Sequence, residues 1–243
     1  MKRIIKYFTI ITAAVAGLSS CVSDFDNEPG PATLYTATVT FKPNSDGTYY
    51  LQENDSTVLF VTNSNMKEYP FKVKKERRAM VKYYETKAPV TNALPQPDRV
   101  KYAKNVVLTA LDTIHTKNPV AYDETKDYGK DAMGLYLGYD VFPTTLIEDG
   151  YLNLSFTVPL TTQRHDINIV YGANPDDPYE LMATHNNNGA YGAYQRIDYL
   201  MNFPLKALDV PAGKKVVVTL KWHSLVSGKI ESVKIPYTGR TDW

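Results

Sequence analysis

Apolar and polar residues alternate along the first half of the chain in short runs, and turn-forming residues separate these runs. The turns include Asn44-Ser45-Asp46-Gly47 and Glu53-Asn54-Asp55-Ser56. Short β-branched and aromatic runs between such turns are typical of β-hairpins. Five strands are therefore expected between residues 34 and 118, which is enough for a small barrel or sandwich. They cover 34–41, 48–51, 57–61, 79–84 and 100–114.

The second half of the chain continues this pattern with longer runs. Residues 151–158 alternate cleanly after the turn Glu148-Asp149-Gly150. Further runs cover 166–171, 179–185, 195–205, 214–222 and 229–237. This spacing predicts a seven-stranded, Ig-like β-sandwich. Since no segment after residue 20 shows a sustained apolar stripe with the period of a helix, an all-β protein is expected.

The strand pattern is weakest between the two halves. We therefore predict a first β domain over 34–118, a connector over 119–140 and the sandwich over 141–243. Asp123 to Asp127 fits a short helix or an irregular connector, and the Pro-rich stretch 88–97 predicts a loop.

The amino terminus shows the pattern of an export signal. Positive residues precede an apolar run over 7–18, and the small-residue stretch Leu18-Ser19-Ser20 leads to Cys21. The run is shorter than the roughly 20 residues that a membrane span needs. This arrangement resembles a bacterial lipobox, which implies removal of residues 1–20 and lipidation of Cys21. An ordinary secretory signal with a chance cysteine is the alternative.

Residues 21–33 are acidic and punctuated by Pro and Gly, so they predict a flexible tether. Ser23-Asp24 and Asp26 resemble the acidic surface-export signal of lipoproteins from the Bacteroides group. We therefore expect an outer-membrane lipoprotein that faces the periplasm or the cell surface, with the surface favoured.

Composition narrows the possible partners. Removing residues 1–20 takes away three positive charges, and the formal net charge falls from +1 to −2. This charge is not a general signature of nucleic-acid binding. Once Cys21 carries lipid, no thiol remains for a disulfide, a zinc cluster or a nucleophile. The 19 tyrosines fit either a β-sheet with one wet face or an adhesive surface.

Two phrases in the second half carry a family resemblance. One is Ile147-Glu148-Asp149-Gly150-Tyr151-Leu152-Asn153-Leu154-Ser155-Phe156, and the other is the final pair of runs that begins at Lys214. With the lipobox and the Tyr-rich first domain, the layout resembles the NigD-like lipoproteins of Bacteroides and Prevotella relatives. The resemblance implies a five-stranded OB-like barrel followed by a β-sandwich. The family takes its name from a bacteriocin-associated operon and has no established activity, so an immunity-type role is one alternative.

Catalytic and metal-site patterns are not found in the sequence. The four histidines, at 115, 165, 185 and 223, lack metal-ligand spacing, and each falls near the end of an expected strand, where an exposed imidazole is common. No Gly-x-Ser-x-Gly elbow is present. Asp176, Asp177 and Glu180 are the acids that a glycoside hydrolase or a calcium site would use, but their setting is typical of a solvated turn. We therefore expect no catalytic residue, no metal and no cofactor.

Two stretches are candidate contact sites. The first is basic and contains Lys72, Lys74, Lys75, Arg77 and Arg78. A barrel with such a stretch could take single-stranded nucleic acid, but an exported lipoprotein favours an anionic envelope component or a protein. The second is the Gly- and amide-rich loop with Asn186, Asn187, Asn188, Tyr191 and Tyr194. Its amides and aromatic rings suit sugars, although the same composition also forms a long hairpin loop.

The sequence thus predicts a lipid-anchored, non-enzymatic envelope protein that binds a protein or glycan partner, and not nucleic acid, through loops of two β domains. A carbohydrate-active hydrolase of unfamiliar type and an immunity-type protein are the alternatives.

Overall fold

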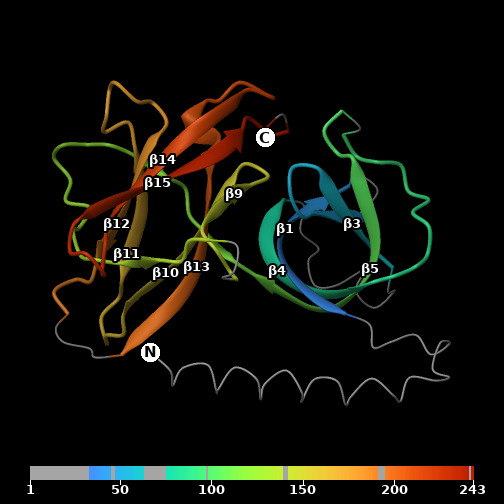
Figure 1. The fold of residues 1–243 in the computed structure, drawn as a ribbon, viewed down its shortest axis with the longest axis horizontal. Coiled ribbons are helices and arrows are strands. Elements are labelled where there is room, and N and C mark those ends of the chain that lie inside the picture. The colour runs from blue at the N-terminus through green and yellow to red at the C-terminus, as the bar shows by residue number, and fades with distance from the viewer. Residues whose placement is uncertain are drawn as a thin grey trace, which may run out of the picture. The chain divides into compact units, whose positions relative to one another are not determined.

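The computed structural model describes residues 33–44, 47–62, 75–96, 98–138, 142–190, 195–240 and 242–243. Cys21 and residues 22–32 of the predicted tether lie outside these residues. The part from Leu34 to Trp243 forms one compact unit, in which a barrel precedes a sandwich (Figure 1).

The first five strands close into a barrel in the order β1-β2-β3-β5-β4. Strand β1 is long enough to pair with both β2 and β4, and β3 runs parallel to β5. Alternate residues such as Val39, Val81 and Leu108 fill the barrel interior. The bounds are β1 (Leu34–Pro43), β2 (Tyr49–Gln52), β3 (Thr57–Val61), β4 (Arg77–Glu85) and β5 (Tyr102–Thr113).

The sandwich contains two sheets. One has the order β6-β13-β10-β8, with β9 also paired to β10, and the other has the order β15-β14-β12-β11-β7. The first consists of β6 (His115–Thr116), β8 (Gly134–Leu135), β9 (Leu146–Glu148), β10 (Tyr151–Pro159) and β13 (Arg196–Pro204). The second consists of β7 (Val120–Ala121), β11 (Asp166–Tyr171), β12 (Glu180–Asn186), β14 (Lys215–His223) and β15 (Ile230–Thr238). A short 3-10 helix, Leu205–Leu208, follows β13.

The five-stranded barrel and the following β-sandwich are confirmed. Short strands β6, β7 and β8 come from residues 115–135, a stretch predicted to lie partly in the first domain and partly in a connector, and they pair within the two sheets of the sandwich. These strands have two residues each, too few for alternation to be visible. The sheets therefore exceed the predicted seven strands, and the 123–127 stretch forms a turn rather than a helix.

The sandwich core lies between its two sheets. Phe156, Phe203, Leu181 and Trp222 are among its buried side chains. Burying one such side chain stabilises the folded state by about 1.5–3 kcal/mol. Alternating runs form strands here because a strand places every second side chain in this core.

Strands β1 and β10 are buried on both faces, unlike ordinary strands of an open sheet. One face of each strand points into its own domain core, as Val39 and Leu154 do. The other faces carry Thr38 and Asn153, which lie within hydrogen-bonding distance of each other. The barrel and the sandwich therefore pack through the polar faces of these two strands.

Candidate functional site

The basic stretch separates into residues with different environments. Lys72 and Lys74 lie outside the described residues, and Lys75 and Arg77 are exposed. Arg78 is only 1% exposed and donates to Thr40 Oγ1 and Asn153 Oδ1, each at 2.8 Å. Arg78 therefore does not belong to a surface patch, because it points from the outer face of β4 into the barrel–sandwich interface.

Arg78 belongs to a larger charged group, which we call the interface network. Its members are Lys42, Arg78 and Arg99 from the barrel, Asp55 and Glu76 from barrel loops, and Glu148, Asp149, Arg240 and Asp242 from the sandwich chain. Every one of these side chains is ion-paired within the described structure.

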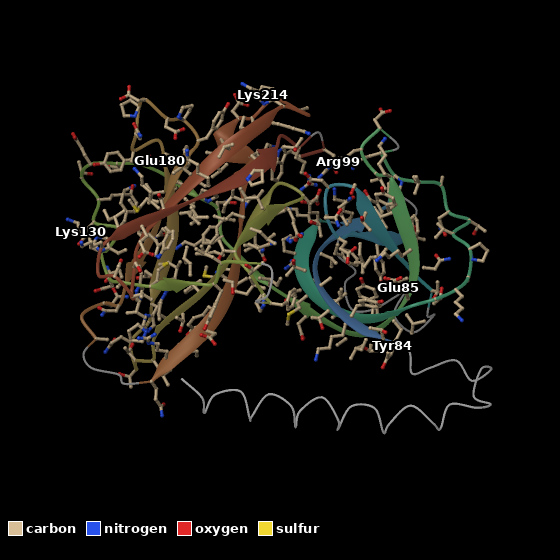
Figure 2. The ribbon with its side chains drawn as sticks, viewed as in Figure 1. Tyr84, Glu85, Arg99, Lys130, Glu180 and Lys214 are labelled. Atoms are coloured by element: carbon tan, nitrogen blue, oxygen red, sulfur yellow. The ribbon has the colours of Figure 1, made fainter. Side chains whose placement is uncertain are left out.

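Asp149 is the centre of the interface network. It is 0% exposed, and its Oδ1 lies 3.2 Å from Lys42 Nζ, 2.8 Å from Arg99 Nη2 and 3.7 Å from Arg240 Nε. Figure 2 labels Arg99, which also pairs with Asp55 at 2.8 Å. One carboxylate of the sandwich thus holds two cations of the barrel.

The backbone at this point requires the residues found there. Asp149 and Gly150 both have positive φ, 46° and 78°, as a two-residue hairpin turn between β9 and β10 demands. A Cβ on Gly150 would lie 2.7 Å from the Trp243 ring and 2.8 Å from Arg240. The Asp-Gly pair therefore sets both the turn and the close approach of the carboxyl-terminal residues.

Asp242 shows how strongly the interface network favours ionised groups. Burial alone would raise the pKa of Asp242, but hydrogen bonds from Arg240 and Lys42, both at 2.7 Å, outweigh burial. The pKa of Asp242 therefore lies well below its usual range. Because its acids and bases neutralise one another in a buried place, the interface network is suited to joining two domains rather than to chemistry on a ligand.

The predicted Asn-rich loop follows β12, and its amides are used within the chain. Asn188 Nδ2 donates to Arg164 O at 2.7 Å and Asp166 Oδ2 at 3.0 Å. Asn186 Oδ1 accepts from the Asn188 backbone at 2.8 Å, and Asn187 Oδ1 accepts from Gly189 at 3.0 Å. These bonds stabilise the turn, which is the conformational alternative for this composition. Tyr191 and Tyr194 lie outside the described residues.

Next to this loop, an open cleft of about 710 Å³ lies on the outer face of the second sheet; we call it the sandwich cleft. Met182 and Thr184 of β12 and His223 of β14 form its floor, since their neighbours in each strand face the core. Residues 122–131 form its wall. The volume is typical of a ligand-binding site.

The wall of the sandwich cleft is fixed to the sheet by backbone bonds. Asp131 N donates to His185 O at 2.9 Å, and Tyr122 N donates to Tyr171 O at 2.8 Å. Gly129 has φ of 83°, and a Cβ there would lie 2.4 Å from His185 O. A side chain at 129 would therefore push the wall away from β12.

Two tyrosines and several charges line this wall. The Tyr122 and Tyr128 rings stack with centroids 6.5 Å apart, and Tyr122 is 51% exposed. The charged residues at the rim are Glu124, Lys126, Asp127, Lys130 and Asp131. In Figure 2, Lys130 lies at the edge of the sandwich, on the wall segment.

Two neighbouring histidines, the buried His185 and the partly buried His165, lie behind the floor of the sandwich cleft. His185 is 1% exposed, so the expectation of an exposed imidazole is wrong there. Its Nδ1 donates to Ala132 O at 3.1 Å, and His165 Nδ1 lies 2.7 Å from its Nε2. Leu181, Ala183 and His185 share the inward face of β12, so the alternation along the strand is the signal that could have identified this burial.

His185 is held in its neutral form. Burial lowers its pKa and the neighbouring His165 adds to this effect, while the bond to Ala132 opposes it. Among the described residues, no three His, Cys, Asp or Glu side chains group as metal ligands. The turn acids Asp176, Asp177 and Glu180, which are described residues, do not form such a group either. Glu180 instead pairs with Lys221 at 2.8 Å.

Comparison with known proteins gives both a family and a fold. The family profile of the NigD-like C-terminal beta sandwich domain matches residues 116–237, half of the chain. This start agrees with the observed sandwich, which includes β6 to β8. No curated protein matches the chain.

Solved structures from Bacteroides and Parabacteroides species share the fold. A protein described as toxin-related from Parabacteroides distasonis is 24% identical, with a TM-score of 0.62 over 85% of this chain and 94% of that one. A NigD-like immunity protein from Bacteroides caccae is 17% identical, with a TM-score of 0.55 over 87% and 99%. A protein described as a lipoprotein from Bacteroides fragilis is 11% identical, with a TM-score of 0.55 over 86% and 100%. At these identities the likeness concerns the fold.

Helices capable of crossing a bilayer are not found in the described residues.

Proposed function

The chain belongs to the family with a NigD-like C-terminal β-sandwich domain, and from this premise we propose that it is a lipid-anchored, non-enzymatic binding protein of the cell envelope. The observation that carries the proposal is the sandwich cleft. It is open, it has tyrosines at its wall, and its rim charges have both signs.

The anchor is proposed from the lipobox pattern that ends at Cys21, and a structural neighbour described as a lipoprotein supports it. Acyl chains on Cys21 would insert into the outer membrane, with about 0.8 kcal/mol for each buried CH₂ group. The acidic tether over 22–33 would hold the two domains away from the bilayer, and the surface-export pattern favours the outer face.

Metabolic labelling with an alkyne fatty acid tests the anchor. The native protein should carry the label and fractionate with outer membranes, and the Cys21→Ser variant should lose both properties. Proteinase added to intact cells should remove the native protein if it faces outward. A Cys21→Ser variant that keeps its label would contradict the proposed lipidation site.

A protein segment is the partner that this site fits best. Interfaces between proteins are enriched in tyrosine at their centre and carry a polar rim, which matches Tyr122 beside Lys126, Asp127 and Lys130. Rim charges of both signs would select a partner segment that also carries both signs, and they would set its register.

Photo-crosslinking in living cells tests the sandwich cleft. A photoreactive amino acid at Lys130 should give a discrete protein adduct, and the same group at Lys214 should not. Both lysines are exposed and lie on the sandwich, which makes them a matched pair (Figure 2). Replacing Tyr122 with Ala in the Lys130 probe should lower the adduct yield about tenfold or more, as loss of an interface anchor does.

An adduct that survives Tyr122→Ala unchanged would contradict binding at the sandwich cleft.

An immunity-type role is a narrower form of the same proposal, since two structural neighbours are described as toxin-related and as an immunity protein. Deletion of the gene should then raise sensitivity to a bacteriocin, and Tyr122→Ala should fail to restore resistance.

A further inference from the structure

A second cavity lies on the barrel, far along the chain from the sandwich cleft. It has a volume of about 580 Å³, within the range of ligand sites. We call it the barrel pocket. The β1–β2 turn with the start of β2, the end of β3, the Pro-rich loop between β4 and β5, and Asn105 of β5 contribute its lining.

The part of the lining that the structure describes is polar but uncharged. Its side chains include three amides, Asn44, Asn92 and Asn105, and three hydroxyls, Thr48, Thr62 and Thr91. Two aromatic rings, Tyr49 and Phe60, complete it. Among the described residues, no Lys, Arg, Asp or Glu lines this pocket. The rim of the sandwich cleft, by contrast, carries charges of both signs.

The aromatic part of the barrel pocket is held in place from behind. The Tyr49 ring stacks on Phe41 of the barrel core with centroids 4.3 Å apart. Burial raises the pKa of Tyr49 to about 12, so its phenol stays neutral at physiological pH. Tyr49 therefore presents a rigid, uncharged aromatic ring to the pocket.

The loops that frame the barrel pocket are also fixed. Asn105 Nδ2 donates to Ala88 O at 3.3 Å and to Pro89 O at 3.0 Å, which holds the start of the Pro-rich loop against β5. Asn44 Nδ2 donates to Thr48 Oγ1 at 2.9 Å and closes the β1–β2 turn. Such preorganisation lowers the entropy that binding would cost.

The Pro-rich loop leaves hydrogen-bonding capacity at the barrel pocket. Thr91 and Asn92 are exposed on that loop, and among the described residues neither side chain has a hydrogen-bond partner. An amide both donates and accepts, and a hydroxyl does the same. These groups match hydroxyl-bearing ligands, which also donate and accept.

From this lining we propose that the barrel pocket binds a neutral oligosaccharide. Sugar hydroxyls would pair with Asn92 and Thr91, and the apolar C–H face of a pyranose ring would pack on Tyr49 and Phe60. Nucleic acid and acidic glycans fit poorly, because phosphate and carboxylate groups need cationic or dense N–H partners. This inference is independent of the protein partner proposed for the sandwich cleft.

Titration calorimetry of the purified full-length protein tests the proposal. The probes are cellohexaose, maltohexaose and mannohexaose, with hexagalacturonate and a thymidine hexanucleotide as charged comparisons. At least one neutral hexasaccharide should bind with one site per chain, and the charged probes should bind at least about tenfold more weakly.

Variants locate the binding. Asn92→Ala should weaken the neutral sugar about fivefold, as expected for a lost hydrogen bond, and Phe60→Leu should weaken it by a similar factor while keeping an apolar residue. Asn118→Ala, an exposed amide on the sandwich chain, serves as the matched control and should change affinity less than about twofold. Tyr122→Ala in the sandwich cleft should leave sugar binding unchanged.

Three results would overturn the proposal. They are no binding by any of the neutral hexasaccharides, equal binding of the charged probes, or an Asn92→Ala affinity equal to that of the native protein. None of these results would bear on crosslinking from the sandwich cleft, so the two proposals fail separately.

Discussion

The interface network and the barrel pocket are both polar, but the polar groups of the first are paired within the chain and some of those of the second are open to solvent. In the interface network, the carboxylate of Asp149 is buried with three cations around it. In the barrel pocket, Thr91 and Asn92 are exposed, and no described residue pairs with their side chains. The charged groups of the interface network are therefore less available to a ligand than the neutral groups of the barrel pocket.

This difference has a physical origin. Two β domains that pack through the polar faces of β1 and β10 must pair every charge they bury, because an unpaired buried charge costs several kcal/mol. A binding site has the opposite requirement, since its groups must keep hydrogen-bonding capacity for a partner. Clusters of titratable residues thus indicate structure here, and sparse neutral groups indicate binding.

The largest effect is expected at Asp149. Asn in its place keeps the shape and tolerates the positive φ, but it removes the charge that Lys42, Arg99 and Arg240 share. We expect the free energy of unfolding to fall by about 3–5 kcal/mol, as when one partner of a buried ion pair is lost. Urea denaturation measures this change. The exposed turn acid Asp176→Asn is the control and should change stability by less than about 0.5 kcal/mol.

A smaller effect is expected at Gly129, in the wall of the sandwich cleft. Ala at this position is strained by the positive φ, and its Cβ would meet His185 O. We expect a loss of more than about 1 kcal/mol in the free energy of unfolding. Gly172→Ala shares a positive φ but has open space around it, so it separates backbone strain from the clash. Equal losses in the two variants would mean that the wall does not press on β12.

The histidine pair predicts a pH dependence of stability. The folded pKa of His185 lies below its ordinary value of 6.5, so the unfolded chain binds more protons between these two values. The free energy of unfolding should therefore fall as the pH drops through 6.5 towards the folded pKa. The groups around the ring are His165, Asp131 and the Ala132 carbonyl, with Thr161 behind His165.

Thermal unfolding between pH 7.5 and 5 tests this dependence. His185→Gln should flatten the slope, and the exposed His115→Gln should leave it intact. A slope that His185→Gln leaves unchanged would assign the pH dependence to other groups.

The smallest effect is expected for an exposed ion pair of the barrel. Lys104 Nζ and Glu85 Oε1 are 2.7 Å apart, a distance similar to those in the interface network, but both side chains are about one-third exposed. Glu85→Gln should cost at most about 1 kcal/mol, and added salt should reduce the difference further. A loss equal to that of Asp149→Asn would remove the distinction between buried and exposed pairs.

The longer strands of this fold could be predicted from the sequence, because a period of two is visible in a single run such as 151–158. The two-residue strands β6, β7 and β8 are too short to show this period. The Asp149-Gly150 turn was also predictable, since Asp-Gly between two alternating runs is a hairpin signal. The interface network was not predictable, because its pairs join residues far apart in the chain, such as Arg78 with Glu148 and Glu76 with Arg240.

Local composition was misleading where tertiary packing decides. Arg78 lies in a basic run, yet the sandwich covers the outer face of β4 at that point. The amides of Asn187 and Asn188 suggested a sugar site, but the turn itself uses them. The uncharged barrel pocket gave no sequence signal, because its lining comes from four separate segments.

The central claim is that the interface network holds the two domains together while the open sites carry function. The most direct test is the yield of the Lys130 photo-adduct in the Asp149→Asn variant, compared at equal amounts of folded protein. We predict an unchanged yield despite the lower free energy of unfolding. Loss of the adduct in folded Asp149→Asn protein would place the partner's contact at the interface network and contradict the claim.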